Sequence, residues 1–473
     1  MHRFLLVLTL ASWCIVSYAQ TITVSSELSL RSEYNYDILG VMDGNLLLIR
    51  DGINEFDVQA YDEDMYMTWE AEKELDSRKS RIINIIPHDD RFYILYSDDW
   101  KDSLAIMVRV YNPKAQLEYT DTIKTLKRGL VRPKYRFTKS EDRNIFLMTE
   151  MESERIVSAF AYNLRESELL WETELQFTNI NFREEYRKTL ISNDGTMFLV
   201  FEKNNLRYRK EEHALGIFRF TRGNQDVSAV EVPITEFTTY DGYFMFDNLN
   251  QKVVIIGLYS DKNSGITDGI YHVRIDANNL ENYKLSTVDY NAELIADFHG
   301  KFNPKKESLT NLDVQDVVLR QDGGALVLAE ENKEYERLSY GSRRDYYGSN
   351  RFSVDYYYED LVLISIHPDG TSHWQKLLPK RQYSNDDLGA YSSYYIFTNP
   401  SYLRILYNDE IRNDNTVSEY ILNGAGDITR RSLMSTDNQK IKLQIKNAVQ
   451  IDSETLVIPS VRGNRLKLVK LEY

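Results

Sequence analysis

The sequence predicts an all-β fold, a β-propeller of eight four-stranded blades. Three observations lead to this prediction: a polar hairpin turn recurs along the chain, a solid apolar strand follows the turn, and helical patterns are almost absent. The turn recurs at roughly 50-residue intervals, apart from two longer steps that contain insertions, and this period is typical of one propeller blade.

The recurring turn is built from Asp, Asn and Gly residues, which favour the tight reversal of a β-hairpin. It is found at Asp43-Gly44, Asp89-Asp90, Glu141-Asp142, Asn193-Asp194-Gly195, Asn248-Leu249-Asn250, Asp322-Gly323, Asn399-Pro400 and Asp452-Ser453. Each turn joins the first and second strands of a unit, so the turns predict eight blades, with seven as the alternative.

The stretch from Asp313 to Arg381 shows the expected unit most clearly. In order, it contains the strand 314–319, the turn Asp322-Gly323-Gly324, the strand 325–329, a tyrosine-rich loop, the strand 361–366, the turn Pro368-Asp369-Gly370 and a strand through Trp374. Four antiparallel strands in sequence order form a meander that needs no partner outside the unit.

The second strand of each unit is a continuous apolar run rather than an alternating one. Examples are 46–49, 92–95, 145–148, 197–200 and 253–256. A strand of this kind is buried on both faces, as when neighbouring blades stack.

The fourth strand begins with a large aromatic residue in several units. Trp69, Trp171 and Trp374 occupy this place in three units, and Tyr119 occupies it in another. Large aromatic side chains dominate core burial. We therefore expect the tryptophans to be largely buried between blades, the alternative being an exposed binding platform.

The last unit offers three strands from Lys442 to the end of the chain. The missing fourth strand is available at the other end, within Thr21–Leu30. We expect this segment to pair with Leu466–Leu471, because closure of the ring in this way removes two exposed sheet edges.

Residues 1–19 have the pattern of a secretory signal peptide. Arg3 supplies the positive charge, 4–16 the apolar region, and Ser17-Tyr18-Ala19 the small-residue cleavage site. Residues 20–473 then form a single propeller domain without cysteine, because the one cysteine lies in the signal. The remaining sequence contains no glycosylation sequon. We expect a secreted protein of the bacterial periplasm or outer cell surface.

The chain carries a formal net charge of −15. An acidic protein lacks the basic footprint that phosphate backbones require, which argues against nucleic acid as a partner. No stretch of 20–473 is long and apolar enough to predict a transmembrane segment. The oligomeric state stays open.

Signals for catalysis are weak. The chain has seven histidines, and none of them belongs to a zinc-binding or nucleophile motif. We therefore predict no catalytic residue, no metal site and no cofactor. Carboxylates are so numerous that a catalytic pair of the glycosidase kind stays an open alternative.

The segment His367-Pro368-Asp369-Gly370-Thr371-Ser372-His373-Trp374 combines an apolar strand, a polar turn and a tryptophan. It resembles the repeats of the quinoprotein-like eight-bladed propellers, and residues 163–171 resemble them less closely. The resemblance implies the architecture alone. The full signature of the quinone-binding enzymes is missing, so it implies no cofactor and no catalytic residue.

The long connections are expected at one end of the propeller, because successive loops of an antiparallel meander alternate between its two ends. Insertions at 291–311 and 331–360 are the largest, and 292–298 within the first is the one predicted helix. Tyrosine mixed with Ser, Gly, Asn and Arg is typical of binding loops. The candidate binding residues are Arg207, Arg209, Tyr340, Arg343, Arg344, Tyr346, Tyr347, Tyr356, Tyr357 and Tyr358.

Two hypotheses for function follow from this pattern. The first is a non-catalytic propeller that binds a protein partner in the cell envelope, as an accessory of an outer-membrane or secretion assembly. The second is a propeller that binds or degrades a glycan, with the tyrosines as stacking platforms for an acidic sugar chain. Fold alone does not decide between the two hypotheses.

Overall fold

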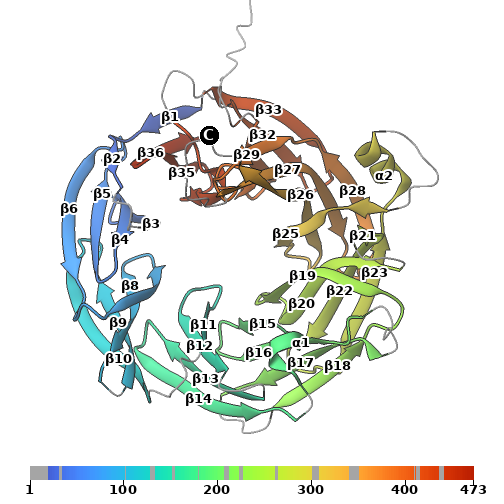
Figure 1. Cartoon of the computed structure of the whole chain (residues 1–473), viewed down its shortest axis with the longest axis horizontal. Coiled ribbons are helices and arrows are strands. Elements are labelled where there is room, and N and C mark those ends of the chain that lie inside the picture. Colours follow the sequence, from blue (N-terminus) through green and yellow to red (C-terminus); the bar gives the residue numbers. More distant parts are fainter. Residues whose placement is uncertain are drawn as a thin grey trace, which may run out of the picture.

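A computed structural model of the chain shows a closed ring of antiparallel sheets (Figure 1). The structure describes residues 20–30, 35–101, 103–127, 134–151, 155–178, 180–206, 212–222, 227–261, 265–300, 308–339, 351–409, 411, 416–435 and 441–473.

Eight sheets of four or more strands confirm the predicted eight-bladed β-propeller. The first four blades are β3 (Asn35–Met42), β4 (Asn45–Asp51), β5 (Glu55–Tyr61) and β6 (Met67–Glu74); β7 (Arg81–Pro87), β8 (Phe92–Asp99), β9 (Ser103–Tyr111) and β10 (Leu117–Lys127); β11 (Lys134–Lys139), β12 (Ile145–Met151), β13 (Ile156–Asn163) and β14 (Glu168–Gln176); and β15 (Tyr186–Ile191), β16 (Met197–Lys203), β17 (Ala214–Phe220) and β18 (Ser228–Pro233).

The next three blades are β19 (Thr238–Asp247), β20 (Lys252–Ser260), β22 (Gly269–Asp276) and β23 (Tyr283–Asp289); β25 (Leu312–Leu319), β26 (Ala325–Ser339), β27 (Arg351–Ile366) and β28 (Ser372–Leu378); and β30 (Tyr394–Thr398), β31 (Tyr402–Asn408), β32 (Thr416–Asn423) and β33 (Ile428–Ser435). The eighth is β34 (Val449–Gln450), β35 (Thr455–Arg462), β36 (Arg465–Glu472) and β1 (Thr21–Val24), with β2 (Leu28–Ser29) also on β36. A two-stranded sheet joins β21 (Ile266–Thr267) to β24 (Leu309–Thr310).

All eight predicted turns join the first and second strands of a blade. The turn between β3 and β4 shows why Asp and Gly are favoured, since Asp43 and Gly44 both have positive φ, 49° and 74°. A two-residue hairpin turn of the favoured hand needs this conformation, which Gly adopts freely and Asp adopts at modest cost. The turn residues therefore set the strand boundaries.

The two ends of the chain close the ring as expected. Thr21 pairs with Glu472, Val24 with Val469, and Leu28 with Leu466, all antiparallel to β36. The N-terminal strand thus supplies the outermost strand of the eighth blade, whose other strands come from the C-terminal segment.

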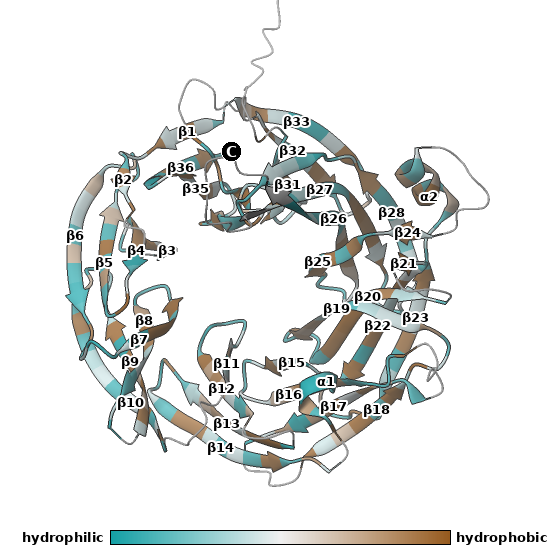
Figure 2. Cartoon of the chain, viewed as in Figure 1, coloured by the Kyte–Doolittle hydropathy of each residue, from teal (hydrophilic) through white to brown (hydrophobic). Residues whose placement is uncertain are grey.

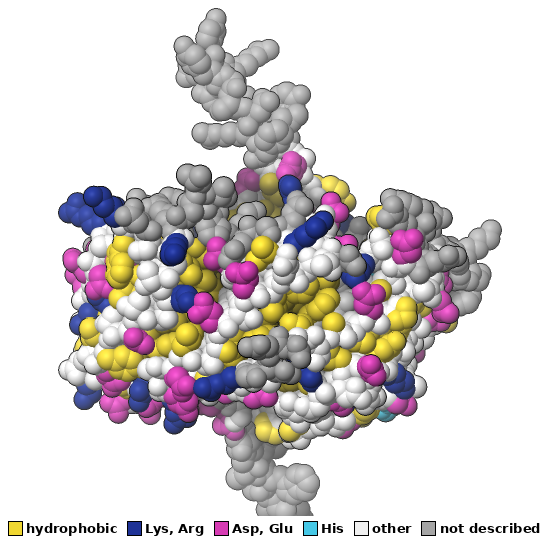
Figure 3. Space-filling view, turned by 90° about the horizontal axis from the view of Figure 1, so that it is seen from below, with side chains coloured by type: hydrophobic (Ala, Val, Ile, Leu, Met, Phe, Trp, Pro, Cys, Tyr) yellow, Lys and Arg dark blue, Asp and Glu magenta, His cyan; other side chains and the backbone are white. Residues whose placement is uncertain are grey.

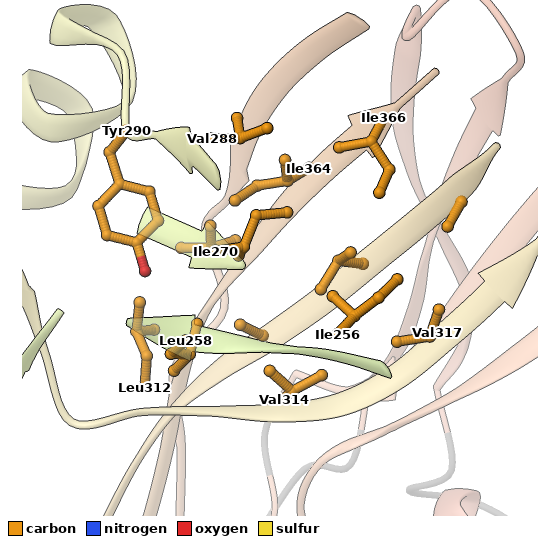
Figure 4. Packing of buried hydrophobic residues seen from close by; sticks show 14 of the residues in the cluster. Ile256, Leu258, Ile270, Val288, Tyr290, Leu312, Val314, Val317, Ile364 and Ile366 are labelled. Carbon is orange, nitrogen blue, oxygen red and sulfur yellow. The ribbon is translucent and has the colours of Figure 1, made fainter. Parts of the chain in front are cut away.

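The hydrophobic core lies between the blades rather than at one centre. Figure 2 shows long hydrophobic stretches on β20 and β22, whereas the outer strands β6, β14 and β33 mix hydrophilic and hydrophobic residues. Between the fifth and sixth blades, Ile256, Ile270, Val314 and Ile364 meet from β20, β22, β25 and β27 (Figure 4). In Figure 3, apolar side chains form a band along the side wall, and charged side chains flank it. The solid apolar runs are therefore explained by burial on both faces.

Trp69, Trp171 and Trp374 occupy equivalent positions, each opposite the third strand just beside a register shift. Trp171 is 7% exposed, and its indole Nε1–H donates to the Gly195 carbonyl oxygen of the next blade at 2.8 Å. The prediction of large burial between blades is confirmed for Trp171, and Trp69 and Trp374 are partly buried against the cores between blades. The depth differs because turns of the next blade cover the outer part of each indole, and these turns differ from blade to blade.

The predicted helix is present as α2 (Ala292–His299), capped by the Asn291 side chain, which accepts the Leu294 N–H at 2.8 Å. A second short helix, α1 (Phe182–Glu185), and a 3-10 turn, η2 (Ile445–Asn447), were not expected from the sequence. Both lie in connections between blades, where a single helical turn leaves little periodicity to detect.

The structure differs from the expected loop over 331–360. Strands β26 and β27 continue past the end of the blade, with pairs from Asn332–Tyr358 to Ser339–Arg351. Strand β29 (Gln382–Asn385) adds to β27 through pairs from Asp355–Asn385 to Tyr358–Gln382. The extension was missed because its residues are polar and tyrosine-rich, without the apolar runs that mark the other strands.

Candidate functional site

The candidate site is this extension, which we call the projecting sheet and define as 332–339 of β26, 351–358 of β27, and β29. It lies at the end of the sixth blade where the second and third strands connect, as the alternation of loops predicted. Because side chains of a strand alternate between its two faces, each face can be read from the register.

One face of the projecting sheet carries a row of three tyrosines, one from each strand. Tyr335 and Tyr357 pack edge to face with ring centroids 5.7 Å apart, and Tyr357 and Tyr383 are tilted at 5.0 Å. Tyr335 is 53% exposed, whereas the other two are half-buried. Aromatic pairs of this geometry stabilise one another and hold their rings in place. The row therefore presents an ordered apolar surface, with the exposed ring of Tyr335 at one end.

A polar cluster lies beside the tyrosine row on the same face. The Asp355 carboxylate accepts hydrogen bonds from the Tyr383 hydroxyl at 2.6 Å and from Asn385 Nδ2 at 2.9 Å, and it pairs with the Arg337 guanidinium. The Tyr383 hydroxyl, followed by Arg337 and Asn385, lowers the pKa of Asp355. Arg337 itself is 61% exposed, so its remaining N–H groups point toward solvent.

The opposite face holds the projecting sheet to the propeller. Tyr356 is 5% exposed, and Tyr358 is half-buried beside Gly389 of the following loop. The loop is tied to β27 because Asp386 Oδ1 accepts the Val354 N–H at 2.8 Å and the Val354 carbonyl accepts the Asp386 N–H at 3.0 Å. The sheet is therefore a supported platform.

A fully buried ion pair lies at the base of the projecting sheet. Lys380 Nζ is 2.6 Å from Glu330 Oε1, and both side chains have no exposed surface. The ammonium also donates to the Tyr358 carbonyl at 3.1 Å and to Gln382 Oε1 at 2.8 Å, and Ser393 donates to Glu330 Oε2 at 2.7 Å. Burial lowers the pKa of Lys380, whereas the Glu330 charge opposes this shift. The pair links β26, β29 and the start of the seventh blade.

Of the binding residues predicted from the sequence, the three in β27 lie in the projecting sheet: Tyr356, Tyr357 and Tyr358. Tyr357 lies in the tyrosine row, whereas Tyr356 and Tyr358 lie on the anchoring face. Arg207, Arg209, Tyr340, Arg343, Arg344, Tyr346 and Tyr347 lie outside the described residues. The binding assignment stays a prediction.

Sequence reasoning missed Tyr335, Arg337 and Tyr383. The signal that could have found the first two is their alternate spacing, which places them on one face of a strand. The neighbour Tyr383 had no such signal, because β29 follows β28 in the chain and pairs with β27 further along the same edge.

A second buried charged cluster lies in the fourth and fifth blades. Glu202 accepts a hydrogen bond from Arg187 Nε at 2.7 Å, lies 3.1 Å from His213 Nε2, and bonds the Thr239 hydroxyl. Burial raises the pKa of Glu202, but hydrogen bonds from His213, Thr239 and Arg187 outweigh burial and lower it. These contacts link the fourth blade to the fifth.

Within the described ranges, no group of three or more His, Cys, Asp or Glu side chains is arranged to hold a metal ion. In the same part of the chain, no helix combines the length and the apolar character that crossing a bilayer requires.

No protein-family model matches this chain, and no curated protein matches it either. Several solved structures show a distant similarity to this chain. The dipeptidyl peptidase 4 of Porphyromonas gingivalis has a TM-score of 0.45 at 11% identity, over 91% of this chain and 56% of that chain. Sqt1 of Saccharomyces cerevisiae has a TM-score of 0.43 at 9% identity, over 94% of this chain and 99% of that chain. The β-propeller domain of the Trilobed protease from Pyrococcus furiosus, described as having an open velcro topology, has a TM-score of 0.38 at 10% identity. The match covers 85% of this chain and 98% of that chain.

At these TM-scores the similarities carry no argument about this chain, and the eight-bladed β-propeller rests on its own strand pairing. The resemblance of one sequence segment to the quinoprotein-like propellers stays a prediction. Function has to be argued from the residues of this chain.

Proposed function

We propose that this protein is a non-catalytic propeller that binds a protein partner in the bacterial cell envelope through the projecting sheet. The single observation that carries this proposal is the ordered row of Tyr335, Tyr357 and Tyr383 on a supported platform. Long segments on one end of a rigid scaffold are where binding residues concentrate.

The chemistry of the row suits a protein surface. Tyrosine offers a large contact area at a low cost in side-chain entropy, and arginine beside it adds directional hydrogen bonds. Arg337 is held by Asp355, so its exposed guanidinium is positioned before a partner arrives. Pre-organisation of this kind reduces the entropy that binding has to overcome.

The glycan hypothesis is favoured less by the geometry. Sugar rings stack on flat aromatic faces, but the planes of Tyr335 and Tyr357 meet at 80° and those of Tyr357 and Tyr383 at 58°. The row therefore offers edges and one open ring rather than a continuous flat platform.

The test is a pull-down from membranes of the native host with the Tyr335→Ser variant as bait. Truncation of a central interface tyrosine typically costs about 2 kcal/mol of binding free energy or more, so the partner seen with the unmodified protein should be lost. Tyr66→Ser is the matched control, because Tyr66 is 71% exposed on another blade.

Thermal melting of both variants shows whether folding is intact. A partner retained by Tyr335→Ser at full yield would contradict the proposal. Loss of binding to acidic polysaccharide, without any protein partner, would favour the glycan hypothesis instead. Export through the signal 1–19 is checked by N-terminal sequencing of the mature protein, which should begin at Gln20.

A further inference from the structure

Along the projecting sheet, one edge of β26 is covered by none of the strands that the structure describes, and we call it the uncovered edge. Inside the blade this edge is covered by β25, whose last pair with β26 is Leu312–Glu331. One more bond follows, from the Asn332 N–H to the Asn311 carbonyl at 3.0 Å. Asn311 has φ of 57°, the left-handed conformation that Asn tolerates, and the chain before it runs to β24 instead. Beyond Asn332, no described strand pairs with this edge of β26.

The backbone groups that face this edge can be assigned from the register. The Asn332 N–H points to the β25 side, and the pairing with β27 is regular from Asn332 to Ser339. In an antiparallel strand, alternate residues direct their N–H and C=O groups to the same side. Glu334 and Glu336 therefore present their backbone donors and acceptors at the uncovered edge.

The side chains at the edge have opposite character on the two faces. Glu334 and Glu336 are exposed on the face of Tyr356, where Asp386 and Asp387 add further negative charge. No ion pair joins either glutamate to a cation among the described residues. On the other face, the open ring of Tyr335 stands between the two glutamates along the strand. The edge thus combines backbone groups that have no partner among the described residues, a strip of acidic side chains and an aromatic ring.

We propose that the uncovered edge of β26 accepts an extended segment of the partner protein as an added strand. Main-chain hydrogen bonds give such an addition its affinity, and alternate side chains give it specificity. The segment carries Lys or Arg at the alternate positions that face Glu334 and Glu336, and apolar residues at the positions beside Tyr335. This inference rests on the proposed function and names the chemistry of the partner for the same site.

The direct test uses a fluorescein-labelled peptide in which lysine and valine alternate, measured by fluorescence anisotropy with the full-length mature protein. We expect saturable binding. The same lysine–valine peptide with N-methylated lysine amides keeps the charge but cannot donate the main-chain hydrogen bonds of an added strand, and a peptide that alternates glutamate and valine has the wrong charge. Equal binding of the N-methylated peptide would show attraction without strand addition and overturn the proposal.

Two variants of the edge sharpen the test. Glu336→Pro removes one outward N–H without breaking the pairing with β27, because proline is tolerated where the N–H faces solvent. Loss of this backbone hydrogen bond and of the Glu336 charge should weaken binding of the lysine–valine peptide about tenfold. Glu334→Lys with Glu336→Lys should reverse the preference toward the glutamate–valine peptide. Glu72→Lys on β6 is the matched control and should change nothing, since Glu72 is exposed on an outer strand.

The outcomes separate this inference from the proposed function. If Tyr335→Ser loses the native partner but Glu336→Pro keeps it, the projecting sheet binds a protein without strand addition and the inference fails alone. If neither variant affects the partner, the proposed function fails as well. The alternative occupant is a second copy of this chain, and size-exclusion chromatography over a range of concentrations tests it. Self-association that Glu336→Pro abolishes would show that the edge binds a second copy and would contradict the proposal of a different partner protein.

Discussion

At the scale of single residues, the buried ion pair between Lys380 and Glu330 supports the projecting sheet. Taking two charges out of water is costly, and their attraction compensates only when the remaining hydrogen bonds are satisfied. Gln382, Ser393 and the Tyr358 carbonyl supply these bonds. The pair therefore fixes where β29 and the seventh blade meet β26, rather than adding a large net stability.

Removal of one partner from this pair should be strongly destabilising. Lys380→Met leaves a buried carboxylate without its cation, which costs about 3–5 kcal/mol. The double variant Lys380→Met with Glu330→Leu removes both charges and should recover most of the loss. Urea denaturation followed by tryptophan fluorescence measures both. A single variant as stable as the unmodified protein would contradict the role of the pair.

A second residue-scale effect concerns pH. Burial, and then the charge of Asp313, raises the pKa of Asp241 to about 6, although the Val314 N–H bond opposes this shift. The folded protein therefore holds this proton more tightly than the unfolded chain, whose carboxyl titrates near 3.8. Stability contributed by the protonated form is lost as pH rises from 3.8 to about 6.

We expect Asp241→Asn to remove this loss. The difference in melting temperature between the variant and the unmodified protein should increase across that pH range and stay constant above it. The increase should be roughly one or two degrees, because Asp241 is open to solvent. Melting curves by circular dichroism across the range test the expectation. A constant difference at every pH would show that Asp241 does not titrate there.

At the scale of elements, the outer strands are fixed by aromatic residues that reach the next blade. Trp171 packs against Phe220 with ring centroids 4.8 Å apart, and Tyr119 bonds the Ser167 hydroxyl of the third blade. Trp374 contacts the turn at Gly424, where its Nε1–H donates to the carbonyl at 3.4 Å. The aromatic residue near the start of the fourth strand thus contacts the next blade in each case, although its depth of burial differs.

The depth of burial predicts a ranking of substitutions. Trp171→Ala should cost about 3–5 kcal/mol, the usual range for a large aromatic cavity. Trp69→Ala and Trp374→Ala should cost less, because water already reaches part of each indole. Trp100→Ala is the control, since Trp100 is 46% exposed. Chemical denaturation gives the order, and equal losses at all four positions would contradict it.

At the scale of the whole molecule, the ring is closed by strands from opposite ends of the chain. Strand β1 lies along β36, and the Ser25 hydroxyl accepts the Leu468 N–H at 2.9 Å just after β1 ends. Closure gives the eighth blade its fourth strand, so the edge of β36 is covered by β1 and β2.

Deletion of residues 20–30 should therefore expose the edge of β36. We expect a lower melting temperature and concentration-dependent aggregation, because an uncovered strand edge pairs with other chains. Light scattering after size-exclusion chromatography measures the aggregation. A monomeric deletion variant that melts as cooperatively as the unmodified protein would show that closure contributes little.

The sequence by itself determined the number of blades, the turns that separate the strands and the closure of the ring. These features depend on local chemistry, since Asp43 and Gly44 favour their own turn and an apolar run such as 253–256 demands burial whatever its partner. The last unit likewise has only three strands in the sequence, which predicts that the N-terminal segment supplies the fourth.

Only the tertiary structure decided how the candidate site is built. The tyrosine row joins residues from three strands, and the Lys380–Glu330 pair joins residues 50 positions apart in the chain. Residues 331–360 lack apolar runs, so only their pairing with each other and with β29 shows that they are strands. Contacts between distant segments depend on the register of the whole sheet, and no local pattern encodes them.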